Sequence, residues 1–244
     1  MIQYVKKVKI TGYKERIMCG RYVLKANIEE LEKKYGAIPD GYFEFAPNYN
    51  VAPSVDMPVI LERDEARKIS SMRWGLVPPW AESPNTRYTM INARAETLST
   101  KRSFSKPFES RRCIIPANGF YEWKKSSSGK IPHYITKPDG SLINFAGLYE
   151  IWKGREGEII SSFTIITTEA NETIRGLHDR MPAMLLPEEI KSWLNPSEHN
   201  LTYLQDLLRP WPDDGILYYR VGTEVNNARN SGSQLIEPYS DLFG

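Results

Sequence analysis

A helical pattern of apolar residues follows Asn27. The apolar positions lie three and four residues apart, at Ile28, Leu31 and Tyr35. This spacing puts them on one face of a helix. Asn27 can cap the first turn, Glu30 can complete a capping box, and Gly36 can end the helix. The sequence therefore predicts a helix over residues 28–35.

Most of the remaining chain is rich in β-branched and aromatic residues, as strands are. Residues 57–61 and 68–74 predict a hairpin with a charged turn at 62–67. Further strands are expected at 112–116, 120–124, 132–136, 143–152 and 161–167, and near the end at 218–225 and 234–238. Short helices are expected at 168–177, 187–194 and 200–208.

Many strands, a few short helices and no alternation of strand and helix indicate an α+β fold. We expect one β-rich domain, with mainly antiparallel sheets in a barrel-like core flanked by a few short helices. The 244 residues, 41% hydrophobic and 25% charged, suit a single large domain. Residues 1–17 are rich in lysine and lack an apolar core, so they are not a secretory signal. We expect them to be an extension, removed or upstream of the true start, and the domain to span 18–240.

Composition narrows the class of protein. A net charge of +2 does not indicate a broad basic surface for nucleic acid. The densest basic run, which is either a local patch or a solvated face, consists of Lys101, Arg102, Lys106, Arg111 and Arg112. Cys19 and Cys113 form no disulfide framework and no zinc motif, so we expect a cytoplasmic protein without metal or cofactor. No run approaches the roughly 20 apolar residues of a membrane span.

Cys19 follows Met18, and this position gives it a chemistry that other cysteines lack. If translation begins at Met18 and that methionine is removed, Cys19 carries an α-amine beside its thiol. Their pKa values, about 7.7–8.0 and about 8.5, leave both groups partly reactive near neutral pH. The amine can condense with an aldehyde to an imine, which the thiol closes to a thiazolidine. An internal Cys19 could form only a labile hemithioacetal, and a free cysteine is most often a buried hydrophobe.

Two side chains are candidates for proton transfer. On a strand, Glu122 shares a face with Phe120, where apolar surroundings can raise the pKa of its carboxyl. An ordinary exposed strand residue is the alternative. His178 lies where a predicted helix ends, and imidazole titrates in the range that suits a proton relay. A lone histidine is, however, more often structural.

Three further polar residues could hold a substrate. Asn92 and Arg94 share a face if the chain is extended there, and could hold an amine or carbonyl together with a phosphate. Asn92 could instead cap a turn. Arg180, two residues after His178, offers a planar fork for phosphate or a partner for a surface salt bridge.

Several of these residues lie in motifs that resemble one family. The motifs are Cys19-Gly20-Arg21-Tyr22, Tyr49-Asn50-Val51-Ala52-Pro53, Arg73-Trp74-Gly75-Leu76-Val77-Pro78, Ile91-Asn92-Ala93-Arg94-Ala95-Glu96-Thr97, Gly119-Phe120-Tyr121-Glu122-Trp123, His178-Asp179-Arg180-Met181-Pro182 and Leu235-Ile236-Glu237-Pro238. In their order and spacing they resemble the SOS response-associated peptidase (SRAP) family over residues 19–238.

The resemblance implies a sensor of abasic sites in single-stranded DNA, acting in the DNA damage response. The family captures the sugar aldehyde of the lesion in a reversible thiazolidine crosslink, a lyase-type activity, and is also described as a peptidase that removes its own leader. Carried onto this chain, Cys19 is the nucleophile and Asn92 orients the amine or the ring. Glu122 shuttles protons, and His178 assists opening of the sugar ring.

The resemblance also implies a DNA interface. Arg94 and Arg180 would bind flanking phosphates, and Trp80 would stack against the DNA. Trp74, Asn50 and Pro53 are expected on the same interface. Ala81 stands where the family often has a second aromatic residue, which weakens the expected wedge between strands. A monomer is expected, in the cytoplasm and at the nucleoid when bound to DNA, with no membrane contact.

Two other functions compete with this interpretation. The first is an N-terminal-nucleophile hydrolase of peptides that uses Cys19 with Glu122 and His178. The second is a non-catalytic module for single-stranded DNA in which Cys19 is only structural. A covalent product with abasic DNA would separate the crosslinking function from both.

Overall fold

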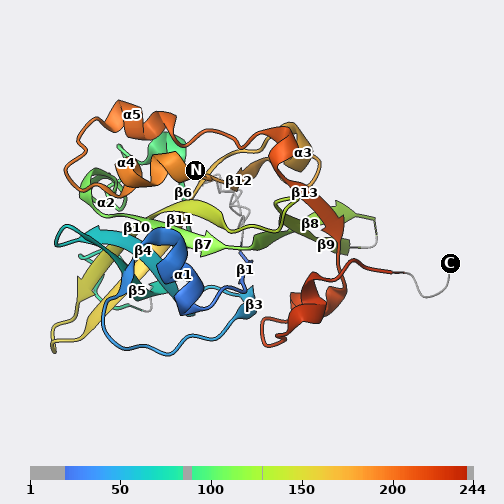
Figure 1. Ribbon diagram of the computed structural model, residues 1–244, viewed down its shortest axis with the longest axis horizontal. Helices are drawn as coiled ribbons and strands as arrows, with labels where there is room; N and C mark the ends of the chain where they lie inside the picture. The colour runs from blue at the N-terminus through green and yellow to red at the C-terminus, as the bar shows by residue number, and fades with distance from the viewer. Residues whose placement is uncertain (1–19, 85–89, 128, 241–244) are drawn as a thin grey trace, which may run out of the picture.

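The structure is a computed structural model that describes residues 20–84, 90–127 and 129–240 (Figure 1). Cys19 and the expected extension, 1–17, lie outside the described residues. The strands are β1 (Tyr22–Leu24), β2 (Ile38–Pro39), β3 (Asn48–Val51), β4 (Asp56–Arg63), β5 (Ala66–Trp74), β6 (Asn92–Arg94), β7 (Arg112–Ala117), β8 (Gly119–Ser126), β9 (Gly129–Thr136), β10 (Ile143–Lys153), β11 (Ile159–Glu169), β12 (Arg180–Pro182) and β13 (Leu217–Arg220).

Helices are few and short. The α-helices are α1 (Ile28–Tyr35), α2 (Ser105–Ser110), α3 (Glu172–Arg175), α4 (Ile190–Leu194) and α5 (Leu201–Asp206). Single 3-10 turns are η1 (Ala95–Thr97), η2 (Pro187–Glu189), η3 (Asp213–Gly215), η4 (Thr223–Asn226) and η5 (Ser233–Ile236). Within the described residues, no helix has the length and apolar character that a membrane crossing requires.

A closed barrel of five strands forms the centre of the fold. Neighbouring strands pair in the order β5, β4, β7, β10 and β11, and a parallel pairing of β11 with β5 closes the ring. Trp74, Phe145 and Phe163 lie fully buried in this core. The predicted α+β class with a barrel-like, mainly antiparallel core is confirmed.

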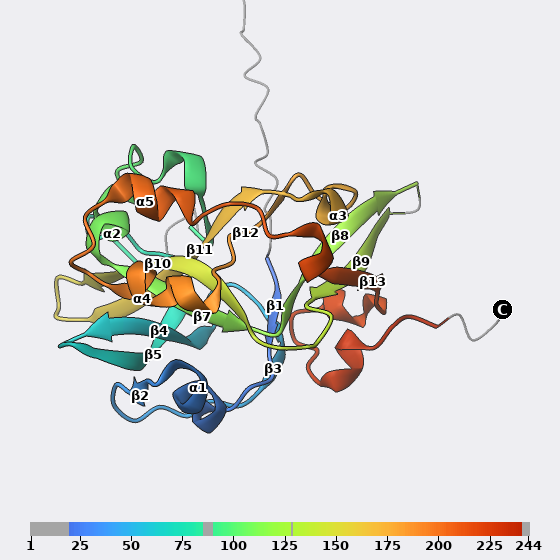
Figure 2. The same ribbon diagram turned by 45° about the horizontal axis from the view of Figure 1, so that its top comes forward.

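A second sheet, in the order β13-β9-β8-β1-β3, packs against the barrel (Figure 2). Successive strand residues face opposite sides of the sheet. Phe120 of β8 therefore joins the barrel core, while Tyr121 packs with Tyr134 in a smaller cluster on the other side. The C-terminal segment, including Val225 and Leu235, covers that second cluster.

The barrel strand β11 carries two short strands on opposite edges. β6 pairs with β11 in parallel and β12 pairs with it antiparallel, and both reach Thr167. α3 leads into β12 and lies on the side of the molecule that holds β8 (Figures 1 and 2). Segments that are distant in the sequence thus meet around the end of β11.

Most predicted elements are confirmed with shifted ends. α1 has the expected capping box, with Glu30 N donating to Asn27 Oδ1 at 2.9 Å and Asn27 N to Glu30 Oε2 at 2.7 Å. The hairpin of β4 and β5 is longer than predicted. The helix expected over 168–177 shrinks to α3 because β11 continues to Glu169.

The prediction of strands at the end of the chain is wrong in part. The strand expected over 218–225 ends at Arg220, and residues 234–238 contain the 3-10 turn η5 in place of a strand. Only Leu235 of η5 is buried, and its carbonyl accepts a 3.4 Å hydrogen bond from Tyr121 Oη. Tyr219 Oη donates to the carbonyl of Ile236 at 2.8 Å. Tyrosine side chains, not a strand partner, bind these backbone groups.

Candidate functional site

The chain after Cys19 enters the second sheet beside β8. Tyr22 pairs with Phe120, and Tyr121 N donates to Arg21 O at 3.0 Å. The same antiparallel register, continued by two residues from Tyr22, sets Gly20 opposite Glu122. Gly20 is the first described residue, and on this continued register the residue bonded to Cys19 falls opposite the buried Glu122.

Glu122 lies on the face of β8 that points toward the barrel, as predicted. It is 4% exposed and shares this face with Phe120, whereas Tyr121 and Trp123 belong to the opposite face. Gly119 allows the start of the strand to approach β9 closely, because a Cβ there would lie 2.4 Å from Ile135 O. The geometry provides a carboxylate with little exposure to water at the entry of the N-terminal segment.

His133 is the cross-strand neighbour of Glu122. The two residues are directly paired between β8 and β9, so their side chains share a face. His133 Nδ1 lies 3.0 Å from Ile131 O. Burial, together with the nearby charges of Lys124 and Arg220, lowers the pKa of His133 despite that hydrogen bond. The imidazole is therefore neutral near pH 7.

Asn92 and Arg94 share a face of β6, in the extended conformation that the sequence predicted. Ala93 between them is buried on the other face. Asn92 pairs with Ile165 and Arg94 with Thr167 of β11. This arrangement fixes both polar side chains on one side of the barrel end.

Trp74 links this strand to β1. Its indole Nε1 donates to Ile91 O at 2.9 Å, directly before Asn92. Its ring packs edge-on against Tyr22, with centroids 5.2 Å apart. Trp74 is fully buried, so we assign it to the core and withdraw its expected contact with DNA. The tryptophan instead joins the segments that carry Gly20 and Asn92.

His178 lies in the turn between α3 and β12. Its backbone N donates to Ile174 O at 3.1 Å, and its side chain is 11% exposed. Nδ1 is 2.8 Å from Asp179 Oδ1 and 3.1 Å from the backbone N of Arg180. The backbone N–H can only donate, so Nδ1 accepts from it in the neutral ring and faces Asp179 as a cation when protonated. Nδ1 makes one contact in each protonation state, and either contact holds the ring in the same orientation.

Arg180 binds Glu96 with a two-pronged ion pair. Nη1 lies 2.5 Å from Oε1 and Nη2 lies 2.9 Å from Oε2, while Nη2 also donates to Thr167 O at 2.5 Å. Burial raises the pKa of the Glu96 carboxyl, but the hydrogen bond and charge of Arg180 outweigh it and the net pKa is lowered. The pair ties β12 to η1, the turn that follows Asn92 and Arg94.

The residues that were predicted to contact DNA differ in how exposed their side chains are. Trp80 is 42% exposed, with the guanidinium of Arg102 4.3 Å from its ring centre. Its loop is fixed because Trp152 Nε1 donates to Ala81 O at 2.8 Å. Pro53 is half-buried in the turn after β3. Of the two tryptophans predicted to contact DNA, Trp80 is therefore the one whose side chain is exposed at the surface.

Asn50 has a positioning role. It is 3% exposed, and its amide nitrogen donates to the carbonyls of Asn227 and Asn230 at 3.0 Å each. Asn50 Oδ1 accepts from Arg21 Nη1 at 2.8 Å. Arg21 Nη1 also donates to Val225 O at 2.9 Å. Asn50 therefore links β3 to Arg21, which precedes β1, and to the C-terminal segment, and its burial contradicts the expected contact with DNA.

The remaining candidates for chemistry lie elsewhere. Cys113 is fully buried, and burial raises the pKa of its thiol, so it is no rival nucleophile. The part of the chain that the structure describes contains no group of three or more His, Cys, Asp or Glu able to hold a metal.

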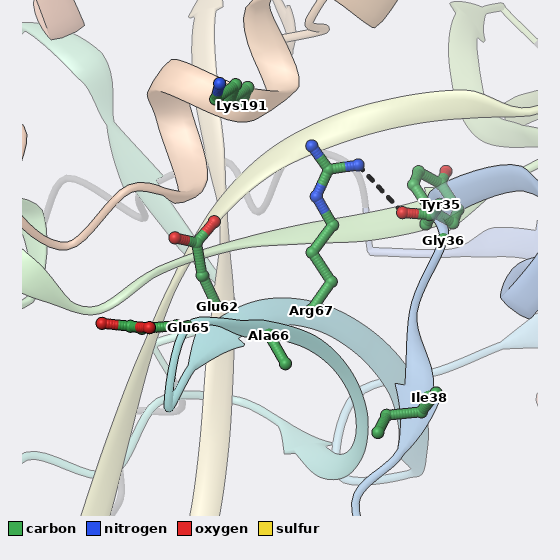
Figure 3. Close-up of a pocket in the computed structure, with 8 residues that line it drawn as sticks. All are labelled: Tyr35, Gly36, Ile38, Glu62, Glu65, Ala66, Arg67 and Lys191. Atoms are coloured by element: carbon green, nitrogen blue, oxygen red, sulfur yellow. Dashed lines mark hydrogen bonds between the residues drawn. The ribbon is translucent and has the colours of Figure 1, made fainter.

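A pocket of about 470 Å³ opens beside α1 and the β4–β5 hairpin (Figure 3). No predicted site residue lines it; its walls include Tyr35, Ile38, Glu62, Glu65, Arg67 and Lys191.

Sequence reasoning missed Glu96 and His133 as parts of the site. Both are ordinary surface residue types, and only the pairing of strands brings His133 to Glu122 and Glu96 to Arg180. Glu96 did stand inside a motif of the recognised family. The histidine count of three was the available signal for His133.

Comparisons with a family model and with known proteins agree with one another. The family model "SOS response associated peptidase (SRAP)" matches residues 18–228. The abasic site processing protein YoqW of Bacillus subtilis (strain 168) is 44% identical over 226 residues, which cover 91% of this chain and 100% of that protein. The abasic site processing protein HMCES of Xenopus tropicalis is 32% identical over 219 residues, covering 77% of this chain and 65% of that protein.

Solved structures agree with the fold. A crystal structure of a protein from Bacteroides thetaiotaomicron superimposes with a TM-score of 0.82 at 28% sequence identity. The match covers 91% of this chain and 100% of that chain. The overall fold of this chain is therefore shared with that protein.

Proposed function

The chain belongs to the SRAP family, and from this membership we propose that it captures abasic sites in single-stranded DNA through an N-terminal Cys19. The observation that carries the proposal is the register of β1 on β8. When that register is continued by two residues from Tyr22, Gly20, which is covalently bonded to Cys19, falls opposite the buried Glu122. Relatives named abasic site processing proteins supply the substrate class.

The proposed reaction is balanced by the loss of one water. The α-amine of Cys19 adds to the sugar aldehyde, and the aldehyde oxygen leaves as water when the C=N bond forms. The thiol sulfur then bonds to the imine carbon, and its proton passes to the ring nitrogen. Glu122 is proposed to donate the proton to the leaving oxygen and to move protons in the reverse reaction.

Two further residues are proposed to serve the substrate. His178 assists the opening of the cyclic sugar to the aldehyde as a general acid or base, and Asn92 orients the amine or the thiazolidine ring. Support comes from the fixed position of each. One Nδ1 contact in each protonation state holds the ring of His178, and β6 holds Asn92 on β11.

The DNA strand is proposed to lie across Arg94, Arg180 and Trp80. The two arginines bind flanking phosphates and the tryptophan stacks on a base, which favours an unpaired strand. Arg180 is already neutralised in part by Glu96, so Arg94, which is exposed, is proposed to supply the stronger phosphate contact.

The reaction requires a free amine at Cys19. We propose that the residues before it are lost, by initiation at Met18 and removal of that methionine or by a peptidase-like cut before Cys19. In the second case the cut is self-processing by the 18–240 domain. The protein is proposed to work as a monomer without a metal or cofactor.

A crosslinking assay tests the proposal. Protein whose N-terminus is Cys19, verified by mass, is mixed with single-stranded DNA that carries one abasic site. We expect an adduct that survives heating in denaturant, and none with Cys19→Ala or with protein that retains Met1. Equal results from the Cys19 protein and Cys19→Ala contradict the proposal, and turnover of a peptide without DNA would favour a hydrolase.

A further inference from the structure

The face of the second sheet that carries Glu122 continues outward past the barrel. Glu122 of β8, His133 of β9 and Arg220 of β13 are paired in one row across three neighbouring strands. Paired residues point to the same side of a sheet. Lys124 and Tyr218 lie two residues from members of this row and so share its face. We call these five residues the outer face.

We propose that the outer face binds the backbone of the single-stranded DNA next to the lesion, with Lys124 and Arg220 on phosphates and Tyr218 against a base. DNA as the partner rests on the proposed function. The face extends directly from Glu122, the group assigned to the lesion itself. It therefore offers the DNA strand a continuous path away from the site.

The charges of the outer face suit a phosphate backbone. Glu122, its one acidic member, is 4% exposed at the inner end, whereas Lys124 and Arg220 are both exposed. His133 between them is neutral. The positive charge available to a polyanion on this face is thus concentrated on the two outer side chains.

Two side chains of the outer face, Tyr218 and Arg220, are held in place by contacts with rings. Tyr218 is 38% exposed and packs edge-on against His133, with centroids 5.6 Å apart. The guanidinium of Arg220 lies 3.7 Å from the ring centre of Tyr239, which is 42% exposed. A stacked guanidinium keeps its edge N–H groups available to a phosphate. Aromatic and cationic side chains together are the usual composition of single-strand binding surfaces.

The opposite face of the same sheet provides a matched control. There Tyr121, Tyr134 and Tyr219 are covered by the C-terminal segment. Lys125 follows Lys124 on β8 and points to that opposite side. Lys124 and Lys125 have the same charge, exposure class and strand, and differ in the face that they occupy.

Salt titration of DNA binding tests the inference. Binding of lesion-free single-stranded DNA is measured by fluorescence anisotropy for the wild type, Lys124→Ala/Arg220→Ala and Lys125→Ala. Each lost phosphate contact reduces the slope of log K against log salt by about 0.7. We expect a slope reduced by about 1.4 in the double variant, with weaker binding at low salt, and an unchanged slope in Lys125→Ala.

A double variant with the wild-type slope overturns the inference, as does a Lys125→Ala slope reduced by about 0.7, the value for one lost phosphate contact. Arg220→Lys, which keeps the charge, should retain the wild-type slope. Thermal unfolding confirms that each variant is folded. Because lesion-free DNA undergoes no covalent step, failure of Cys19 to crosslink abasic DNA leaves this readout intact and is scored separately.

Discussion

Arg112 offers a sharp test of what holds the helices on the barrel. It belongs to the basic run that the sequence analysis left as either a local patch or a solvated face, yet it is 2% exposed. Nε donates to Trp193 O at 2.8 Å, Nη1 donates to Phe108 O at 2.7 Å, and Nη2 donates to Asn195 O. The side chain therefore joins the end of α2 to the end of α4.

Replacing Arg112 with Met keeps much of the volume and removes every donor. Each buried carbonyl that loses its partner costs about 1–3 kcal/mol. Relief of a buried charge offsets part of this loss, since burial lowers the pKa of Arg112 to about 10. We expect a net destabilisation of about 3 kcal/mol, with a smaller loss for Arg112→Lys, which keeps the charge and has fewer donors.

Urea unfolding followed by tryptophan fluorescence measures this loss. Lys106→Met, an exposed position on α2, is the control and should stay within about 0.5 kcal/mol of the wild type. A change of under about 0.5 kcal/mol for Arg112→Met would refute the buried clamp. The salt slope of DNA binding should also be unaffected, because Arg112 is not at the surface.

Three further predictions follow from the site. In a double-mutant cycle with Arg180→Gln, Glu96→Gln should show a coupling of about 1 kcal/mol at pH 7, because the Glu96 side chain is about half-exposed. Since the folded pKa of Glu96 lies below its ordinary 4.5, this coupling is present above pH 4.5 and should vanish as the pH falls through the lower folded value. Trp80→Ala should weaken binding of single-stranded DNA by about 1–3 kcal/mol in anisotropy titrations without changing the thermal midpoint; unchanged affinity would exclude stacking. Gly119→Ala should lower the thermal midpoint, because its Cβ would lie 2.4 Å from Ile135 O.

Short sequence patterns correctly predicted the structural features that depend on residues close together in the chain. The capping box and apolar stripe of α1, the β4–β5 hairpin and the orientation of Glu122 depend on residues close together in the sequence. Family motifs added the polar residues of β6 and the turn before β12. These features were within reach because spacing alone decides which side chains share a face.

Contacts between residues that lie far apart in the sequence could not be predicted from the sequence alone. The parallel contact of β11 with β5 that closes the barrel joins Phe163 to Trp74, and this burial removed Trp74 from the expected DNA contacts. Likewise, nothing near Arg112 in the sequence signals that carbonyls from α4 surround its guanidinium. Such interactions depend on which surfaces meet after folding, and they produce no periodic pattern of residues in the sequence.

The central claim is that the α-amine and thiol of Cys19 together trap an abasic site. The most direct test is the intact mass of the adduct between protein that begins at Cys19 and abasic single-stranded DNA, followed by proteolysis and mapping of the modified peptide. We expect the sum of the two masses less one water, with the DNA remnant on the peptide that begins Cys19-Gly20-Arg21. An adduct mapped to a lysine or to Cys113, or the absence of any adduct, would contradict it.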